Sequence, residues 1–483
     1  MTSAARMRKN RSQLFGRRAA VAAIVALAVL ASLLVTAETQ AVEASTPISA
    51  KAAHSRHGAH AGFEKGLGGW KKTNHRTRLD RVRGGHGHGH YAARIRAPRS
   101  GRASIGMTDA PSMIRHTDRG QMYRAHVYLR ASRAAVRHTR VVAHIRLAQQ
   151  HNGKSKVHTW RRVRLSNSRW KSVTVWLTAR ARNDQVGVTV TAAHVRAGAG
   201  ILVDSVNVRR VASPRVKHSV LRGTRYGASV DNGSRDWTKA LHRADHRYGR
   251  LDAVRFFDPY SPSSWSGRLG DTNRPLVYSF SAKPSAILNG NYDRQLTRWF
   301  KAAPKRWPIW WTYRHEPEDN IEHGEFAASR YRQAWRHVNH LANKAHNPKL
   351  HPTLILMCWT LSPNSGRHFK DYYPGNFIQV LGFDCYNSSS SVTRYKPPSQ
   401  IFYRAVAKAH ALHKRLGVAE FGSRIVPGDD GSRRAMWLAD MARYLGRHNA
   451  AFATYWDARI PAGNFKLHDL PSRKAWHAVV SAH

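Results

Sequence analysis

Eight apolar runs of strand length alternate with helical stretches between residues 221 and 483, and this rhythm constrains the fold more than any other feature of the chain. The runs lie at 225–230, 251–257, 274–281, 308–316, 353–360, 377–387, 416–423 and 451–458. The stretches between them, such as 325–345 and 433–448, place apolar residues at three- and four-residue spacing, which is typical of amphipathic helices. Eight such alternations in about 260 residues predict an α/β domain of the (β/α)8 TIM-barrel type.

The preceding region, 62–213, has a different pattern. Its apolar and polar residues alternate along short runs, which is typical of half-buried strands, and Gly, Asn and Asp turns separate the runs. We therefore expect an antiparallel β-sandwich of the jelly-roll kind before the barrel. Linkers are expected at 45–61 and 214–220. The clearest strand runs are 122–129, 141–147, 172–177, 186–190 and 201–208.

The first 44 residues have the layout of a secretory signal. Basic residues precede an uncharged apolar run, 19–36, and small residues follow it. The protein is therefore expected to be secreted or extracellular. If the leader is not cleaved, its run of roughly 18 residues is long enough to anchor the chain in a membrane at the cell surface.

The chain contains two cysteines, Cys358 and Cys385. Both lie in apolar runs predicted to be strands of the barrel. Two cysteines are too few for a disulfide framework, so we expect two buried free thiols and a fold stabilised by its core.

The charge is strongly positive, with 80 Lys and Arg against 28 Asp and Glu. Such a field favours anionic partners. The basic residues are scattered, and no zinc spacing, helix-turn-helix or aromatic RNA-binding signature accompanies them, so no specific nucleic-acid partner is expected. An anionic cell wall polymer is the expected alternative, or a membrane surface if the leader is retained. Compositional bias and solubility would explain the charge equally well.

Three histidines, His86, His88 and His90, occupy alternate positions in the run GGHGHGHY. On a strand they would share one face and could bind a metal. No carboxylate or cysteine stands beside them in the sequence, so a solvated loop is expected.

Two glutamates stand at the carboxyl ends of predicted barrel strands. Glu316 closes the fourth run, PIWWTYRHE, and Glu420 lies near the end of the seventh. The carboxyl ends of the strands form the active-site face of such a barrel. A facing pair of carboxylates suits glycosidic cleavage, at about 5–5.5 Å for a retaining enzyme and about 6.5–9.5 Å for an inverting one. Opposed strands can supply the shorter distance.

The residues before Glu316 raise two questions. Successive residues of an ideal strand point to opposite faces, so His315 and Glu316 can both reach the barrel mouth only if the strand twists or bulges at its end. Arg314 would lower the pKa of Glu316 if it lay beside it, and would help to keep Glu420 ionised if it lay there instead. A structural ion pair is a further reading of Arg314. Glu318 is expected to be a loop carboxylate.

The sandwich resembles jelly-roll carbohydrate-binding modules through its opening FEKGLGGW (63–70) and its closing ILVDSVNV (201–208). The resemblance implies a polysaccharide ligand. It also implies a structural calcium ion, with Glu64 and Asp204 as candidate ligands. The aromatic residues that would stack on sugar stay open among Tyr123, Tyr128, Trp160, Trp170 and Trp176.

The barrel resembles glycoside hydrolase family 26, whose best-known members are endo-β-mannanases. The resemblance lies in YRHEPED (313–319), DYYPGNFIQVLGFDCYN (371–387), VAEFGS (418–423) and TYWDA (454–458). It implies a retaining hydrolase of internal β-1,4 bonds that needs no cofactor for catalysis. The sequence departs from the family at Thr312 and in the loop 319–322, so mannan, xylan and mixed-linkage glucan all stay open as substrates. A barrel that binds glycan without cutting it is the alternative function.

The resemblance also assigns roles to individual residues. Glu316 would be the general acid and base, and Glu420 the nucleophile. His315 would contact the sugar at the cleaved bond, Tyr386 would hydrogen-bond the nucleophile, and Trp456 would stack under the same sugar. Trp359 and Asp258 also follow strands, so we expect them to contact substrate at the rim.

Overall fold

The computed structural model describes residues 58–132, 141–167, 169–212, 218–221, 223–230, 236–266, 268–387, 392–461 and 463–482. The predicted leader, 1–44, lies outside the described residues. The predicted linkers lie partly outside them, and the domain boundaries stay predictions. In the part of the chain that is described, no helix combines the length and the apolar character that a membrane crossing requires.

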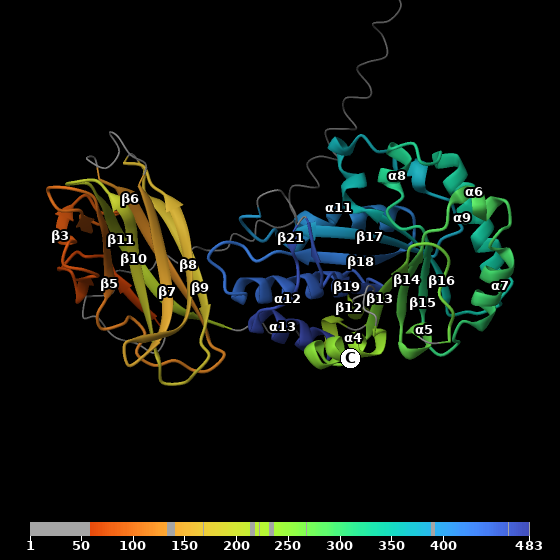
Figure 1. Ribbon diagram of the computed structural model, residues 1–483, viewed down its shortest axis with the longest axis horizontal. Coiled ribbons are helices and arrows are strands. Elements are labelled where there is room, and N and C mark those ends of the chain that lie inside the picture. Colours follow the sequence, from red (N-terminus) through yellow and green to blue (C-terminus); the bar gives the residue numbers. More distant parts are fainter. Residues whose placement is uncertain are drawn as a thin grey trace, which may run out of the picture. The chain divides into compact units, whose positions relative to one another are not determined.

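The amino-terminal region folds into two antiparallel sheets (Figure 1, orange to yellow). One sheet has the order β3-β4-β11-β6-β9, with β1 paired to β11, and the other has the order β2-β5-β10-β7-β8. The strands are β1 Gly58–Ala61, β2 Trp70–Lys72, β3 Arg78–Arg83, β4 Tyr91–Arg96, β5 Ala103–Asp109, β6 Met122–Ala131, β7 Val142–His151, β8 Lys154–Arg164, β9 Lys171–Thr178, β10 Gln185–Val195 and β11 Gly200–Val211.

The predicted sandwich is confirmed. All five of the clearest predicted runs are strands, namely β6, β7, β9, β10 and β11. In β6, buried residues such as Ala125, Val127 and Leu129 alternate with partly exposed ones, as expected where one face packs on the core. The more polar strands, such as β3 with the sequence RLDRVR, lack the apolar residues by which the other strands were predicted. The histidine run lies in the loop between β3 and β4, as expected.

The carboxyl-terminal region is a closed barrel of eight parallel strands in chain order, β12 to β19, so the predicted TIM barrel is confirmed (Figure 1, green to blue). The strands are β12 Arg225–Ser229, β13 Ala253–Asp258, β14 Leu276–Phe280, β15 Ile309–Tyr313, β16 Leu350–Met357, β17 Val380–Asn387, β18 Arg415–Ser423 and β19 Phe452–Tyr455. Each overlaps one of the eight predicted runs.

Helices and short elements connect these strands. The helices are α3 His218–Leu221, α4 Trp237–Tyr248, α5 Arg268–Asp271, α6 Pro284–Leu288, α7 Asp293–Ala302, α8 Glu318–Glu322, α9 Ala328–Asn343, α10 Phe369–Tyr372, α11 Pro398–Ala411, α12 Ser432–Arg447 and α13 Leu470–Val480. The remaining elements are the 3₁₀ turns η1 Cys358–Leu361 and η2 Pro363–Ser365 and the short strands β20 Arg459–Ile460 and β21 Gly463–Asn464.

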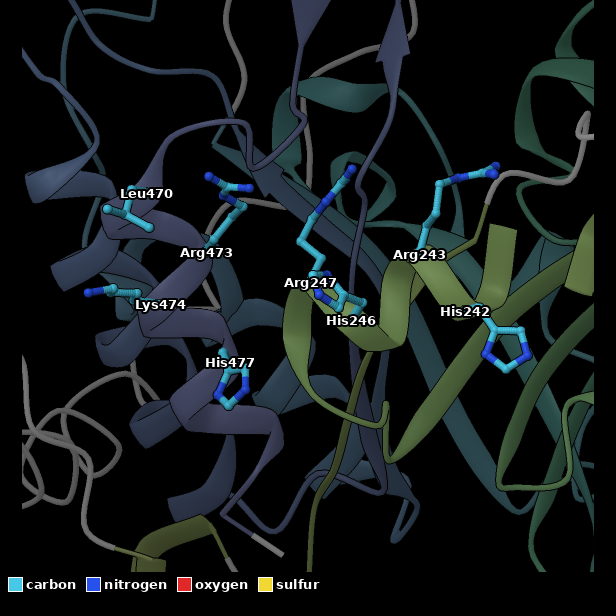
Figure 2. A pocket seen from close by; sticks show the side chains of 8 residues that line it. All are labelled: His242, Arg243, His246, Arg247, Leu470, Arg473, Lys474 and His477. Atoms are coloured by element: carbon cyan, nitrogen blue, oxygen red, sulfur yellow. The ribbon is translucent and has the colours of Figure 1, made fainter. Parts of the chain in front are cut away.

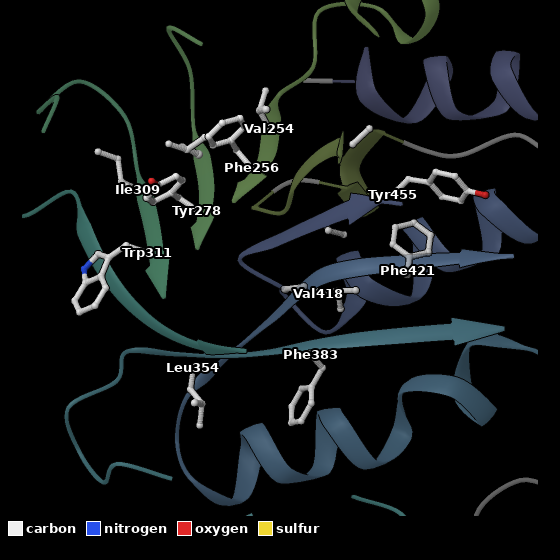
Figure 3. Packing of buried hydrophobic residues seen from close by; sticks show 14 of the residues in the cluster. Val254, Phe256, Tyr278, Ile309, Trp311, Leu354, Phe383, Val418, Phe421 and Tyr455 are labelled. Carbon is white, nitrogen blue, oxygen red and sulfur yellow. The ribbon is translucent and has the colours of Figure 1, made fainter. Parts of the chain in front are cut away.

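The barrel strands are buried on both faces, which explains why their apolar runs are continuous and do not alternate. In β14 and β15 every residue is buried. Residues on one face, such as Phe256, Tyr278 and Trp311, belong to the large cluster that strands and helices share (Figure 3). A smaller cluster contains no helix residue and fills the barrel interior, with the members Val277, Trp310, Ile355, Val380, Ala419, Ala451 and Phe452.

The two cysteines form a disulfide, so the expectation of free thiols is wrong. Cys358 directly follows β16, and Cys385 lies on the neighbouring strand β17. Because Met357 pairs with Asp384 in the parallel register, the next residues along both strands face each other. Their Cα atoms are 5.1 Å apart, within the range that a disulfide spans. Their separation of 27 residues in sequence gave no sign of this contact.

Candidate active site

The chain leaves β15 through a strained turn that carries Glu316. Arg314 and Glu316 both have left-handed backbone conformations, each with φ +46°. The Arg314 N–H donates to the Phe280 carbonyl at 2.7 Å, and the Glu316 N–H donates to the Ile355 carbonyl at 3.0 Å. Left-handed non-glycine residues cost about 1–3 kcal/mol each and cluster at active sites. This turn is the irregularity that the sequence required between His315 and Glu316.

Glu420 lies on β18, and two side chains contact its carboxylate. The Tyr386 hydroxyl donates to Oε2 at 2.5 Å, and Nη2 of Arg255 lies 3.3 Å from Oε1. The hydrogen bond predicted between Tyr386 and Glu420 is therefore present. The register of β18 shifts against both of its neighbours near this position, and such bulges commonly re-aim side chains next to active sites.

Asp384 is a third acid of the site, and sequence reasoning missed it. It lies on β17 with its Cα opposite that of Glu420. Asp384 is 3% exposed, and both oxygens of its carboxyl are buried without a hydrogen-bond partner among the described residues. Burying an unpaired carboxylate is costly, which favours the protonated form of the acid. A buried acid within the apolar run FIQVLGFDCYN was the available signal.

The three carboxyls have different protonation preferences. Burial, followed by the negative charges of Glu420 and Glu318, raises the pKa of Glu316 to about 8, while Arg255 opposes the rise. Burial and the charges of Glu420 and Glu316 raise the pKa of Asp384 well above its ordinary value. Burial also raises the pKa of Glu420, but Arg255 and Tyr386 act against that rise. Arg255 and Tyr386 therefore favour the charged form of Glu420, whereas a pKa of about 8 favours the protonated form of Glu316 at neutral pH.

The cation beside Glu420 is Arg255, and Arg314, whose place the sequence left open, lies elsewhere. Arg255 is fully buried and donates to the Ser279 hydroxyl at 2.7 Å. Arg314 instead bonds the Asn320 side chain at 3.0 Å and the Ser281 carbonyl at 3.1 Å. An arginine inside the apolar run LDAVRFF was the missed signal, because a buried charge needs a partner.

Aromatic rings line the site next to these acids. The ring centre of Phe257 lies 5.6 Å from that of His315 and 6.2 Å from that of Trp456. Burial, with the charges of Arg255 and Arg314, lowers the pKa of His315 well below its ordinary value, so its imidazole is neutral. Among the described residues, the buried His315 Nδ1 and Trp456 Nε1 have no hydrogen-bond partner. The structure thus places both rings around Phe257, each with an unsatisfied polar atom, and their contact with sugar stays a prediction.

Two other predicted rim residues have different environments. Trp359 lies on η1 after β16 and is 53% exposed. Asp258 is buried, and its Oδ2 accepts hydrogen bonds from the Ser263 N–H at 2.9 Å and from the Tyr278 hydroxyl. Its carboxylate thus holds the loop after β13, and its contact with substrate stays a prediction.

Glu318 is fully buried, in contrast to the loop carboxylate that the sequence indicated. Its Oε1 accepts hydrogen bonds from the Met357 N–H at 2.8 Å and from the Thr360 hydroxyl at 2.6 Å. Burial raises its pKa to about 7. The hydrogen bonds of Glu318 therefore connect the segment after β15, which carries Glu316, to the segment after β16, which carries Trp359.

In the sandwich, the two candidate calcium ligands lie at the same loop. Glu64 Oε1 accepts from the Tyr91 N–H at 3.1 Å, and Asp204 Oδ2 accepts from the His86 N–H at 2.6 Å. Burial raises the pKa of Asp204 to about 6, and the Glu64 carboxylate adds to the rise. Within the described residues no group of three or more His, Cys, Asp or Glu side chains gathers as a metal site.

No protein-family model matches the sequence, and no curated protein does. Solved structures with similar folds include the CBM22-1 and GH10 modules of Clostridium thermocellum endo-1,4-β-D-xylanase 10B with xylohexaose, at 11% identity and TM-score 0.35 over 88% of this chain and 97% of that one. Arabinose-bound MgGH51 α-L-arabinofuranosidase gives 12% identity and TM-score 0.30 over 86% and 75%. The CBM22-1 xylan-binding domain of Paenibacillus barcinonensis Xyn10C gives 11% and 0.25 over 32% and 94%. These values carry no information on activity or substrate.

The raised pKa of Asp384 predicts a pH-dependent gain in stability from Asp384→Asn. When the pKa of an acid is higher in the folded state than in the unfolded state, the unfolded state ionises first as pH rises. The free energy of unfolding therefore decreases with rising pH above the ordinary pKa of the acid. The amide removes this penalty, so we expect the melting temperature of the variant to exceed that of the wild type by more at pH 8 than at pH 5. Glu325→Gln, at an exposed acid, should show no such trend. A variant that loses stability equally at both pH values would contradict the prediction.

Proposed function

We propose that the barrel is a glycoside hydrolase that cleaves polysaccharide. The observation that carries this proposal is the asymmetry between its two glutamates. Burial and neighbouring carboxylates raise the pKa of Glu316 to about 8, whereas Arg255 and Tyr386 contact the carboxyl of Glu420 and favour its charged form. Pairs of acids whose environments separate their pKa values are the usual basis for assigning acid and base roles.

The proposed reaction is a double displacement with retention. Glu316 gives its proton to the glycosidic oxygen while Glu420 attacks the anomeric carbon, so the leaving sugar departs as an alcohol and a glycosyl ester forms on Glu420. Glu316, now ionised, takes a proton from water, and the resulting hydroxide displaces Glu420. The neutral His315 and the ring of Trp456 would contact the sugar at the cleaved bond.

The proposed substrate is the internal β-1,4 bond of a plant or wall polysaccharide, with mannan as the first candidate. This choice rests on the short sequence motifs around Glu316 and Glu420, which resemble those of glycoside hydrolase family 26. Xylan and mixed-linkage glucan are the alternatives to assay beside it. Reducing ends released from one of these polymers by the purified protein would identify the substrate, and binding without release would instead support the non-catalytic alternative.

Substituting the two glutamates should give different kinetic losses. We expect Glu420→Gln to abolish turnover of every substrate, because no nucleophile remains. Glu316→Ala should lower turnover of polysaccharide by about 10²–10⁴-fold, the usual contribution of general acid catalysis. The first step with a dinitrophenyl glycoside should be much less impaired, because that leaving group needs no proton. Initial rates and burst kinetics on both substrates test this difference.

Glu325→Gln is the matched control, since it removes an exposed glutamate from the same barrel. Its rates should equal those of the wild type. Circular dichroism should show that all three variants are folded. Normal hydrolysis by folded Glu420→Gln would overturn the assignment of the nucleophile.

For the sandwich we propose polysaccharide binding on the outer face of the sheet that contains β7 and β8. Trp160 on β8 is 50% exposed, and its ring stacks on His144 of β7 with the ring centres 5.6 Å apart. Of the five aromatic residues left open by the sequence, Tyr123 and Trp176 are buried in the fold. An exposed indole is a suitable surface for the apolar face of a sugar.

Trp160→Ala should weaken polysaccharide binding by roughly tenfold, as expected for loss of an aromatic anchor. Trp160→Phe should retain most of the affinity because it keeps a flat apolar ring. Affinity electrophoresis or isothermal titration with mannan and xylan measures both variants in the full chain carrying Glu420→Gln, which prevents hydrolysis. Unchanged binding by Trp160→Ala would contradict this placement.

The structural calcium stays a proposal, and the local chemistry fits it. A Cβ placed on Gly89 would lie 2.7 Å from Glu64 Oε1, 3.3 Å from the His86 carbonyl and 3.6 Å from Asp204 Oδ2. Three oxygens therefore converge on a glycine that leaves space, and calcium prefers oxygen ligands.

Removing calcium with a chelator should lower the melting temperature of the wild type. The variant Glu64→Gln with Asp204→Asn should show no such response, because both carboxylates are gone. Thermal denaturation with and without added calcium checks this. A wild type that does not respond to calcium would remove the proposal.

We also propose that the protein is exported, by way of the leader 1–44. The Cys358–Cys385 disulfide supports this, since such bonds persist mainly in oxidising compartments.

A further inference from the structure

A basic groove lies between α4 and α13, two neighbouring helices of the barrel region (Figure 2). Its volume is about 550 Å³. Four permanently charged side chains line it, Arg243 and Arg247 from α4 and Arg473 and Lys474 from α13. Arg243 and Arg247 are four residues apart and share one face of α4, while Arg473 and Lys474 are adjacent on α13.

The acids of these two helices are committed elsewhere. Asp245, the acid within α4, pairs with Arg274 at 2.7 Å. Asp469, which caps α13, pairs with Arg434, and α13 itself contains no acid. Among the described residues, Arg247 is the one groove cation in an ion pair within 4 Å, with Asp457 at 3.0 Å.

Three of the four cations, Arg243, Arg473 and Lys474, form no ion pair within 4 Å among the described residues, although Asp236 interacts with Arg243 electrostatically. Like charges that line one groove repel one another, and an anion between them would relieve that repulsion. The Nε of Arg473 is buried and has no hydrogen-bond partner among the described residues. This N–H group is thus a donor that a ligand with acceptor oxygens would satisfy. Both features indicate a ligand that carries negative charge.

The lining also indicates what kind of anion fits. Imidazoles of His242, His246 and His477 and the side chain of Leu470, which is 38% exposed, provide flat and apolar contacts. No Trp, Tyr or Phe lines the groove in the described part of the chain, so it lacks the stacking platforms on which nucleic-acid bases bind. Arginine forks match the geometry of carboxylates.

We propose that the groove between α4 and α13 binds an acidic polysaccharide through its carboxylate groups, at a site outside the carboxyl cluster around Glu316 and Glu420. This goes beyond the hydrolase proposal, because the site would hold the protein on a uronate-bearing polymer whether or not that polymer is cut. It also gives part of the high positive charge a specific partner.

The test measures binding of polygalacturonate to the full chain by isothermal titration at several salt concentrations. The double variant Arg243→Gln with Lys474→Gln removes two exposed groove cations. It should weaken binding roughly fivefold or more, since it loses two charge-assisted contacts, and its affinity should depend less steeply on salt.

The control is Arg298→Gln with Lys301→Gln on α7, which removes the same charge from exposed positions outside the groove. It should change the affinity less than about twofold, which is the range of weak surface charge effects. Fully methyl-esterified polygalacturonate has the same backbone without charge and should bind neither variant nor wild type. Arg473→Gln removes a third cation of the groove and tests the same site independently.

Three results would overturn the proposal. Equal losses in the groove and control variants would mean that only net charge matters. Equal binding of the methyl ester would mean that carboxylates are not recognised. Duplex DNA that binds more tightly than polygalacturonate and responds to the groove variants would identify a different class of ligand. Hydrolysis of neutral polymer is measured separately with the same variants, so a failure here leaves the reaction untouched.

Discussion

The contact between Arg255 and Glu420 is the interaction on which the site depends. Arg255 is fully buried, and removing one partner of a buried ion pair typically costs about 3–5 kcal/mol because the other charge is left alone. Arg255 favours the charged form of all three acids, and the charge of Glu420 in turn raises the pKa of Glu316 and Asp384. The pair thus contributes to the difference between the protonation preferences of these acids.

The local backbone adds a second cost to this site. Burial of the three acids raises their pKa values, which opposes their ionisation in the folded chain, and the left-handed conformations of Arg314 and Glu316 cost further free energy. The surrounding barrel compensates through strands buried on both faces and through the apolar cluster that they share with the helices. The apolar cluster between strands and helices therefore stabilises the fold, and the acids lie apart from it at the carboxyl ends of the strands.

Sequence alone was sufficient for the architecture, because periodicity and run length report burial directly. All eight barrel strands and the main sandwich strands could be predicted in this way. The site was only partly accessible. Glu316 follows a strand and Glu420 lies near the end of one, so both could be identified, whereas Arg255 and Asp384 are polar residues inside apolar runs. The disulfide also escaped notice, since pairing across strands depends on register.

That disulfide fastens the strand that carries both Asp384 and Tyr386 to its neighbour, one residue away from each of them. A chain made in a reducing compartment would hold two thiols in this place, and β17 would be held to its neighbour without a covalent bond. The redox state of the compartment therefore determines how firmly the strand that carries Asp384 and Tyr386 is fixed.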